Sequence, residues 1–242
     1  MSEVKVAAIG DIHSPRYLKE FKEALAKFKP EKVDLLLLAG DIVNKGRVEE
    51  YPRVLEALRR KGVKCPIVAC FGNEEYDEKI VKLRRMCGGE ILFLDDEKAV
   101  LEVKGVKIGI VGSRGSLDKP TVWQARNIPG IERLYRERVK KVAKLLSELE
   151  GVSFKVLLLH YSPTYLTMKG EKKEIYPFLG SRMYETVIAE EKPDLVIHAH
   201  VHKGARKAEV AGVPVYNVSL PVWREIPIIT LRKVQTLESY FS

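Results

Sequence analysis

The five histidines of the sequence, and several of its acidic and amide residues, come directly after short apolar runs. Imidazole nitrogens and carboxylate or amide oxygens are the donors that proteins offer to divalent metals. Their position after apolar runs therefore indicates metal chemistry. The five runs end in Gly10-Asp11-Ile12-His13, Gly40-Asp41, Gly72-Asn73-Glu74-Glu75, His160-Tyr161-Ser162 and His198-Ala199-His200-Val201-His202.

Each fragment alone is a weak signal, because a single Gly-Asp is more often a turn and a single histidine more often an ordinary core residue. The five fragments taken together are a stronger signal of a metal site. In α/β sheets, ligand sites gather at the carboxyl ends of the strands, so these side chains are expected to converge. Two aspartates and several histidines buried together without a cation would carry a large desolvation cost. The set contains no thiolate, and it suits manganese, iron, zinc or nickel.

The elements that must position these residues alternate between short apolar runs and amphipathic helical segments, which is typical of helices layered on sheets. We therefore expect an α/β fold with a β-rich C-terminal third. Strands are expected at Val4–Ile9, Val33–Ala39, Pro66–Phe71, Val100–Val103, Val106–Val111, Val156–Leu159, Leu195–Ile197, Ala205–Val210, Val213–Val218 and Ile226–Leu231. Helices are expected at Arg16–Lys29, Val48–Lys61, Asp77–Met86, Ile131–Leu149 and Gly180–Glu190.

A segment without periodicity, residues 113–130, is expected to be a loop. Loops of this length in compact domains are often functional. Arg114 or Arg126 could hold a phosphate, and Trp123 could stack on a base, which makes the three candidates for substrate binding. The alternative is that the arginines form surface ion pairs and that the tryptophan packs against the protein.

Length and composition set further limits. The chain has 242 residues, of which 45% are hydrophobic, and we expect a single domain over residues 1–242. The formal net charge is +9, and only six residues are Asn or Gln. Many charged residues with few amides are typical of hyperthermophile proteins, although a basic surface could also attract anionic substrates or nucleic acid.

The sequence contains no apolar run as long as a membrane helix requires, and its first residues show no signal-peptide core. Its three cysteines form neither an even set nor a C-x-x-C pair. We therefore expect no membrane partner and a cytoplasmic location in a reducing compartment.

The order Asp-x-His, Gly-Asp, Gly-Asn-x-Glu, His and x-His-x-His resembles the calcineurin-like metallophosphoesterases, and the resemblance runs from Gly10 to His202. In detail the sequence is most similar to archaeal and bacterial phosphoesterases related to the cyclic-nucleotide phosphodiesterase subgroup. The resemblance implies a four-layer α-β-β-α sandwich. It also implies hydrolysis of phosphodiesters, or of activated phosphomonoesters, by a hydroxide that bridges two divalent metals, with manganese the expected occupant.

The resemblance also implies a ligand set. Asp11, His13 and His202 would hold one metal, Asp41 would bridge both, and the second metal would be held by Asn73, His160 and His200. The catalytic candidates are Glu74, Asn73 and His13. His198 is not a ligand position that the resemblance assigns, and we expect it to hydrogen-bond behind the ligands.

Two positions depart from the family pattern. The family usually has a histidine where this chain has Glu74, and that histidine is thought to protonate the leaving group. A carboxylate there would repel phosphate, so leaving-group protonation is in doubt. Ala199 stands where glycine is common, and one added methyl group is expected to change little.

Two other functions are compatible with this fold. A non-catalytic scaffold, such as the retromer subunit that the family resembles, would have eroded ligand positions, whereas here all seven carry the expected residue types. A nuclease would act only on short or single-stranded nucleic acid, because the chain has no room for an obvious capping domain. The expected partner is a small phosphoester, such as a nucleotide, and a homo-oligomer is possible.

Overall fold

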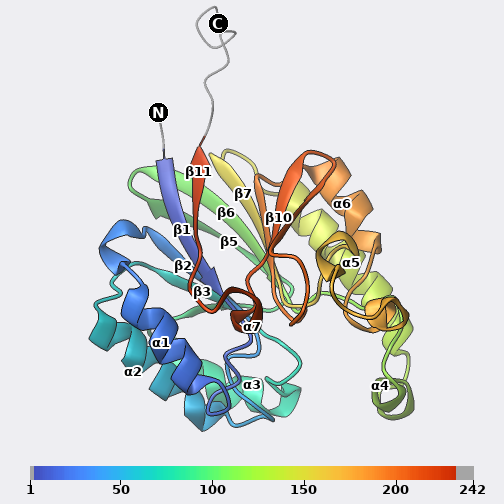
Figure 1. The fold of residues 1–242 in the computed structure, drawn as a ribbon. Helices are drawn as coiled ribbons and strands as arrows, with labels where there is room; N and C mark the ends of the chain where they lie inside the picture. Colours follow the sequence, from blue (N-terminus) through green and yellow to red (C-terminus); the bar gives the residue numbers. More distant parts are fainter. Residues whose placement is uncertain (1–2, 233–242) are drawn as a thin grey trace, which may run out of the picture.

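The computed structural model describes residues 3–232, which form two β-sheets packed face to face between two layers of helices (Figure 1). This arrangement confirms the expected α-β-β-α sandwich. The first sheet has the order β11 (Ile228–Arg232), β1 (Glu3–Ile9), β2 (Leu35–Ala39), β3 (Ile67–Cys70) and β4 (Leu92–Leu94). The second has the order β5 (Glu97–Val103), β6 (Val106–Ser113), β7 (Phe154–Leu159), β8 (Leu195–His198), β10 (Val213–Asn217) and β9 (Lys207–Val210).

The central strands of each sheet are parallel, and antiparallel strands lie at the edges. Strands β1 to β4 run parallel, with β11 antiparallel to β1. In the second sheet β6, β7, β8 and β10 run parallel, whereas β5 and β9 are antiparallel to their neighbours. The carboxyl ends of the parallel strands therefore deliver their connecting loops to one edge of each sheet.

Helices cover the two outer faces. The first sheet is covered by α1 (Leu18–Lys27), α2 (Tyr51–Lys61) and α3 (Asp77–Cys87), and the second by α5 (Ile131–Ser147) and α6 (Met183–Glu191) (Figure 1). Two short helices, α4 (Val122–Asn127) and α7 (Leu220–Trp223), lie in connections. Short 3-10 segments occupy Pro30–Lys32, Val48–Glu50, Leu166–Met168 and Lys173–Phe178. Helix α2 ends at Gly62, whose φ of 89° is the left-handed conformation that glycine adopts easily.

The alternation of side chains along each strand separates three main cores, one between the sheets and one under each helical layer, and a fourth, smaller cluster includes Leu117 and Tyr161. In β1, Val4, Val6 and Ala8 face the second sheet, whereas Ala7 and Ile9 face the helices. Strands buried on both faces are continuously apolar for this reason, as the Leu35–Ala39 run shows. The two sheets thus share the middle core, and both present their loop edge to the same region.

One strand and two α-helices lie where the sequence predicts none. Strand β4 has three residues, and such a short run carries little periodic signal. Helix α4 lies inside the expected loop 113–130, and none of its residues is buried, so it lacks an apolar stripe. Helix α7 has four residues and begins at Leu220, shortly after β10 ends at Asn217.

We predict that the metal-loaded protein unfolds above the mesophile range of about 45–65 °C. The structure has networked surface ion pairs: Glu148 binds Lys98 and Lys144, and Arg59 grips Glu90 with two nitrogens at 2.6 Å. Ion-pair networks contribute more to stability at high temperature, because the cost of desolvating their charges falls as temperature rises. Scanning calorimetry measures the midpoint, and a value inside that range would show that the composition has been misread.

Candidate metal centre

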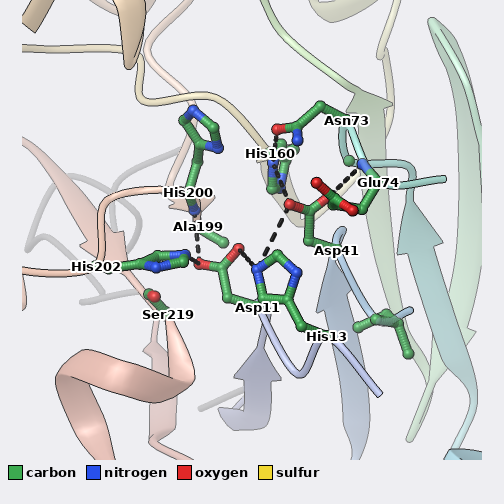
Figure 2. Close-up of polar contacts among 12 residues, drawn as sticks. Asp11, His13, Asp41, Asn73, Glu74, His160, Ala199, His200, His202 and Ser219 are labelled. Carbon is green, nitrogen blue, oxygen red and sulfur yellow. Dashed lines mark hydrogen bonds and ion pairs between the residues drawn. The ribbon is translucent and has the colours of Figure 1, made fainter. Parts of the chain in front are cut away.

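The loops after β1, β2, β3, β7 and β8 bring the sequence-predicted ligands to one place (Figure 2). Two groups form there, and in each the ligand atoms lie within 4.8 Å of one another. One group is Asp11, His13 and His202, and the other is Asp41, His160 and His200. Residues from both sheets thus meet across the seam of the sandwich.

Asp41 lies between the two groups. Its Oδ2 atom is 3.7 Å from Nε2 of His13 and 3.5 Å from Nε2 of His160. Asn73 joins the second group, because its Oδ1 atom is 3.1 Å from Nε2 of His160. A single carboxylate oxygen close to one imidazole of each group is the arrangement that a bridging ligand requires.

The backbone at these positions is strained. Asp11, His13, Asp41 and His200 all have positive φ values, between 44° and 67°. This left-handed region is uncommon for residues with a side chain, and it persists only where the surroundings impose it. Four such residues in one cluster indicate that the fold is built to aim these side chains inward.

Backbone groups orient one histidine and one aspartate of the cluster. Nδ1 of His160 lies 2.9 Å from the carbonyl oxygen of Ala39, which leaves Nε2 directed at Asp41 and Asn73. The backbone amide of His200 donates to Oδ2 of Asp11 at 2.8 Å. Such outer contacts fix the tautomer and the direction of a ligand.

Glu75 shapes the loop that carries Asp41, and sequence reasoning did not assign it a role. Its buried carboxylate accepts four backbone N–H groups, from Gly72, Asp41, Ile42 and Val43, at 2.7 to 3.1 Å. Burial raises the pKa of Glu75, although the four amides oppose that shift. The acidic residue after Gly72-Asn73-Glu74 is the sequence signal that could have pointed to it.

The charges and the unpaired atoms of the cluster fit a cation. Burial and the neighbouring carboxylates of Glu75 and Asp11 raise the pKa of Asp41 well above its ordinary value. Within residues 3–232, both ring nitrogens of His13 and Oδ1 of Asp11 are buried and find no hydrogen-bond partner. Buried polar atoms are rarely left unsatisfied. Divalent metals would satisfy these atoms and offset the repulsion between the carboxylates.

The protonation of the histidines points the same way. Burial lowers the pKa of His200 to about 4 and that of His160 well below its ordinary value, so both imidazoles are neutral and can act as ligands. His202 differs: burial opposes protonation, but the Asp11 carboxylate that it hydrogen-bonds raises the pKa of His202 overall. A metal between Asp11 and His202 would compete with that proton.

His198 and Ala199 lie behind the ligands. His198 is fully buried, burial lowers its pKa to about 4, and its Nδ1 atom is 2.8 Å from the carbonyl oxygen of Ala199. It belongs to neither ligand group. The Ala199 methyl group packs against Gly10, where an added Cβ would lie only 2.5 Å away. The methyl group of Ala199, where the family commonly has glycine, is therefore accommodated because Gly10, directly after β1, has no side chain.

Glu74 is bound to the neighbouring loop. Its carboxylate accepts a hydrogen bond from the backbone amide of Lys45, and its carbonyl oxygen accepts another from Gly46. Its own amide donates to Oδ1 of Asp41 at 2.8 Å (Figure 2). Glu74 therefore contacts the centre through its backbone amide, whereas its side chain is bound to the backbone amide of Lys45.

A pocket of about 660 Å³ opens beside the second ligand group, and Asn73 and His200 contribute to its wall. Two of the predicted substrate-binding residues line it: Arg114 and Trp123. Arg114 is held by Asp77 at 2.8 Å and by the carbonyl oxygen of Glu75 at 3.1 Å. Arg126 is exposed on α4 and does not line the pocket.

Comparison with known proteins identifies the family and the fold. The sequence model of the calcineurin-like phosphoesterases matches residues 4–204. A search of curated protein sequences finds no match.

None of the helices within residues 3–232 is long and apolar enough to cross a membrane.

Several solved structures share the fold at low sequence identity. The phosphopantetheinyl hydrolase of Mycobacterium tuberculosis is 19% identical with a TM-score of 0.69, and the match covers 92% of each chain. A dimetal phosphatase from Danio rerio is 11% identical with a TM-score of 0.56, covering 88% of this chain and 86% of that one. A 5′-nucleotidase precursor from Thermus thermophilus is 16% identical with a TM-score of 0.54, and the match covers 89% of this chain but 48% of that one.

Proposed function

Because the chain belongs to the calcineurin-like phosphoesterase family, we propose that it hydrolyses phosphodiesters, or phosphomonoesters with good leaving groups, at a centre of two divalent metals. The observation that carries this proposal is Asp41, whose Oδ2 atom lies within 3.7 Å of an imidazole of each ligand group. A scaffold protein has no need of a strained and buried carboxylate between two histidine clusters.

The residues of the centre divide between two sites. Asp11, His13 and His202 would hold one metal, Asn73, His160 and His200 the other, and Asp41 both, with manganese the expected occupant. Two bound divalent metals lower the pKa of water and neutralise the phosphoryl oxygens. The protein's own contribution is twofold. Burial keeps the imidazoles of His160 and His200 neutral, and hydrogen bonds fix ring direction, as the Ala39 carbonyl does for His160.

Glu74 determines which esters react well. The Glu74 side chain stands in the place of the family's histidine and is bound to the Lys45 amide, so it is not positioned to donate a proton to a leaving group. Departure of the leaving group therefore depends on its own stability as an anion. Phosphodiesters bear one negative charge at the reacting group and monoesters nearly two, so the Glu74 carboxylate repels diesters less. The expected substrate is a small phosphodiester such as a nucleotide derivative.

We predict that metal-loaded protein cleaves aryl phosphodiesters faster than alkyl phosphomonoesters, and that chelator-treated protein cleaves neither. General acid catalysis contributes typically about 10²–10⁴-fold, so Glu74→His should accelerate esters of poor leaving groups by up to about 10²-fold. Aryl diesters should change little. The measurement is kcat/KM against leaving-group pKa for both proteins.

The matched control is Glu74→Gln, which removes the charge without supplying an acid. It should improve monoester cleavage and leave the dependence on leaving-group pKa unchanged. If wild type and Glu74→His show the same dependence, position 74 is not the place of a general acid. If metal-loaded wild type cleaves none of these esters, the proposed function itself is wrong.

A further inference from the structure

The pocket beside the metal centre has the size of a site for an organic group. Its volume of about 660 Å³ lies within the range of about 300–1,000 Å³ that is usual for small-molecule sites. It extends from Asn73 and His200 to the start of α3 on one side and to α4 on the other. A phosphoester bound at the second ligand group would therefore have one ester substituent directed into it.

Aromatic and apolar side chains make up about half of the pocket lining. Tyr161 and Leu117 are buried at its base, whereas Tyr76 and Trp123 remain 39% and 65% exposed at its rim. Trp123 lies on α4, and no residue of this helix is buried in a core. A capping box between Thr121 and Gln124 holds this helix instead, independently of the indole. The indole is thus exposed apolar surface that a flat ligand could cover.

The charges around the pocket do not favour a second anion. Two carboxylates, Asp77 and Glu78, and one guanidinium, that of Arg114, are the charged groups of its lining. Arg114 is already paired with Asp77 at 2.8 Å and donates to the Glu75 carbonyl oxygen. No cation of the lining remains to hold a further phosphate, so the group that fits is uncharged.

We propose that this pocket binds the ester substituent that stays on the phosphate after cleavage. That substituent is uncharged, flat and ring-bearing, up to the size of a nucleoside, and Trp123 stacks on its ring. The assignment rests on the proposed function, since it places the reacting phosphate at the metal centre. It specifies the substrate further: a phosphodiester with one aromatic or nucleoside substituent and no additional phosphate.

The kinetic test compares diesters that share one leaving group. Methyl 4-nitrophenyl phosphate and thymidine 5′-(4-nitrophenyl phosphate) differ only in the second substituent. Loss of an aromatic stack should raise KM for the thymidine ester about tenfold in Trp123→Ala, with a change of less than about twofold for the methyl ester. The control is Val122→Ala, because Val122 lies on the same helix, is 66% exposed and does not line the pocket. Equal KM changes for the two esters in Trp123→Ala would overturn the proposal.

A charged probe tests whether the substituent that the pocket binds is uncharged. Thymidine 3′-phosphate 5′-(4-nitrophenyl phosphate) adds one phosphate to the same nucleoside. We expect its KM to be equal to or higher than that of the thymidine ester. A KM several-fold lower would show that the pocket attracts anions and that the substituent is not an uncharged one.

A binding measurement separates this inference from the proposed function. The chain has two tryptophans, so Trp223→Phe leaves Trp123 as the only indole. Adenosine has no phosphate to hydrolyse, and millimolar adenosine should quench Trp123 fluorescence saturably, with or without metal. Quenching in a protein that cleaves no ester would support the pocket and contradict the function. Absence of saturable quenching, in a protein that cleaves aryl diesters, would overturn the pocket assignment and leave the function standing.

Discussion

Replacing Asp41 by asparagine is expected to reduce the metal content from about two ions to less than one per chain. It should also lower kcat/KM by more than the roughly 10- to 100-fold that is typical when an outer-shell partner of a metal is lost. The reason is the position of Asp41, within 3.7 Å of His13 and 3.5 Å of His160. A neutral amide cannot bridge two cations, whereas loss of an end ligand would affect one site first. Elemental analysis after reconstitution and kinetics on an aryl diester make the two measurements.

The asparagine keeps the shape of the side chain, and its oxygen can still accept the Glu74 amide that Oδ1 accepts now. The fold should therefore be retained, which circular dichroism checks. A suitable control is Glu132→Gln, which removes one negative charge from an exposed position of α5. Two metals per chain in Asp41→Asn would contradict the bridging assignment.

The layers and the gathering of the ligand candidates could be predicted from the sequence because both depend on local pattern. A continuous apolar run such as Leu35–Ala39 indicates a strand buried on both faces, and parallel strands bring the residues at their carboxyl ends to one edge. Histidine and aspartate in those positions then converge without knowledge of any particular contact. The single domain over residues 1–242 and the roles of the individual site residues stay predictions.

The details that could not be predicted from the sequence depend on contacts between distant segments. The carboxylate of Glu75 meets the backbone of Asp41 across 34 positions of the sequence, and nothing in either segment alone signals that contact. Helix α4 has a readable signal, the Thr121–Gln124 capping box, but no apolar period, so the segment resembles a loop. Because α4 forms one wall of the pocket, missing it also left the pocket unpredicted.

The pairing of Arg114 shows the same limitation. Its residue type is consistent with phosphate binding, and the sequence leaves open whether it contacts substrate or a neighbouring acid. The structure pairs it with Asp77, a residue from a distant segment whose own side chain is 78% exposed. Only the fold brings the two together, at the start of α3.

Replacing Glu75 by glutamine is expected to destabilise the protein by at least about 3 kcal/mol, because hydrogen bonds to a charged group contribute roughly 1.5–3 kcal/mol each and two are lost. Oε1 accepts from Ile42 and Val43, and Oε2 accepts from Gly72 and Asp41. Whichever way the amide turns, its NH₂ group faces two N–H donors. At roughly 2–4 °C per kcal/mol for a chain of this size, the unfolding midpoint should fall by about 6–12 °C.

The same substitution should weaken metal binding, because the displaced loop carries Asp41 in its strained conformation, with a φ of 51°. The matched control is the neighbouring Glu74→Gln, which alters a half-buried carboxylate that accepts one backbone amide instead of four. Its midpoint should stay close to that of wild type. Calorimetry on the metal-free proteins isolates the effect on the loop, and titration with Mn²⁺ then measures the effect on the site. If Glu75→Gln and Glu74→Gln unfold at the same temperature, the four amide contacts do not hold the Asp41 loop, and its geometry must come from the packing of β2 and β3 alone.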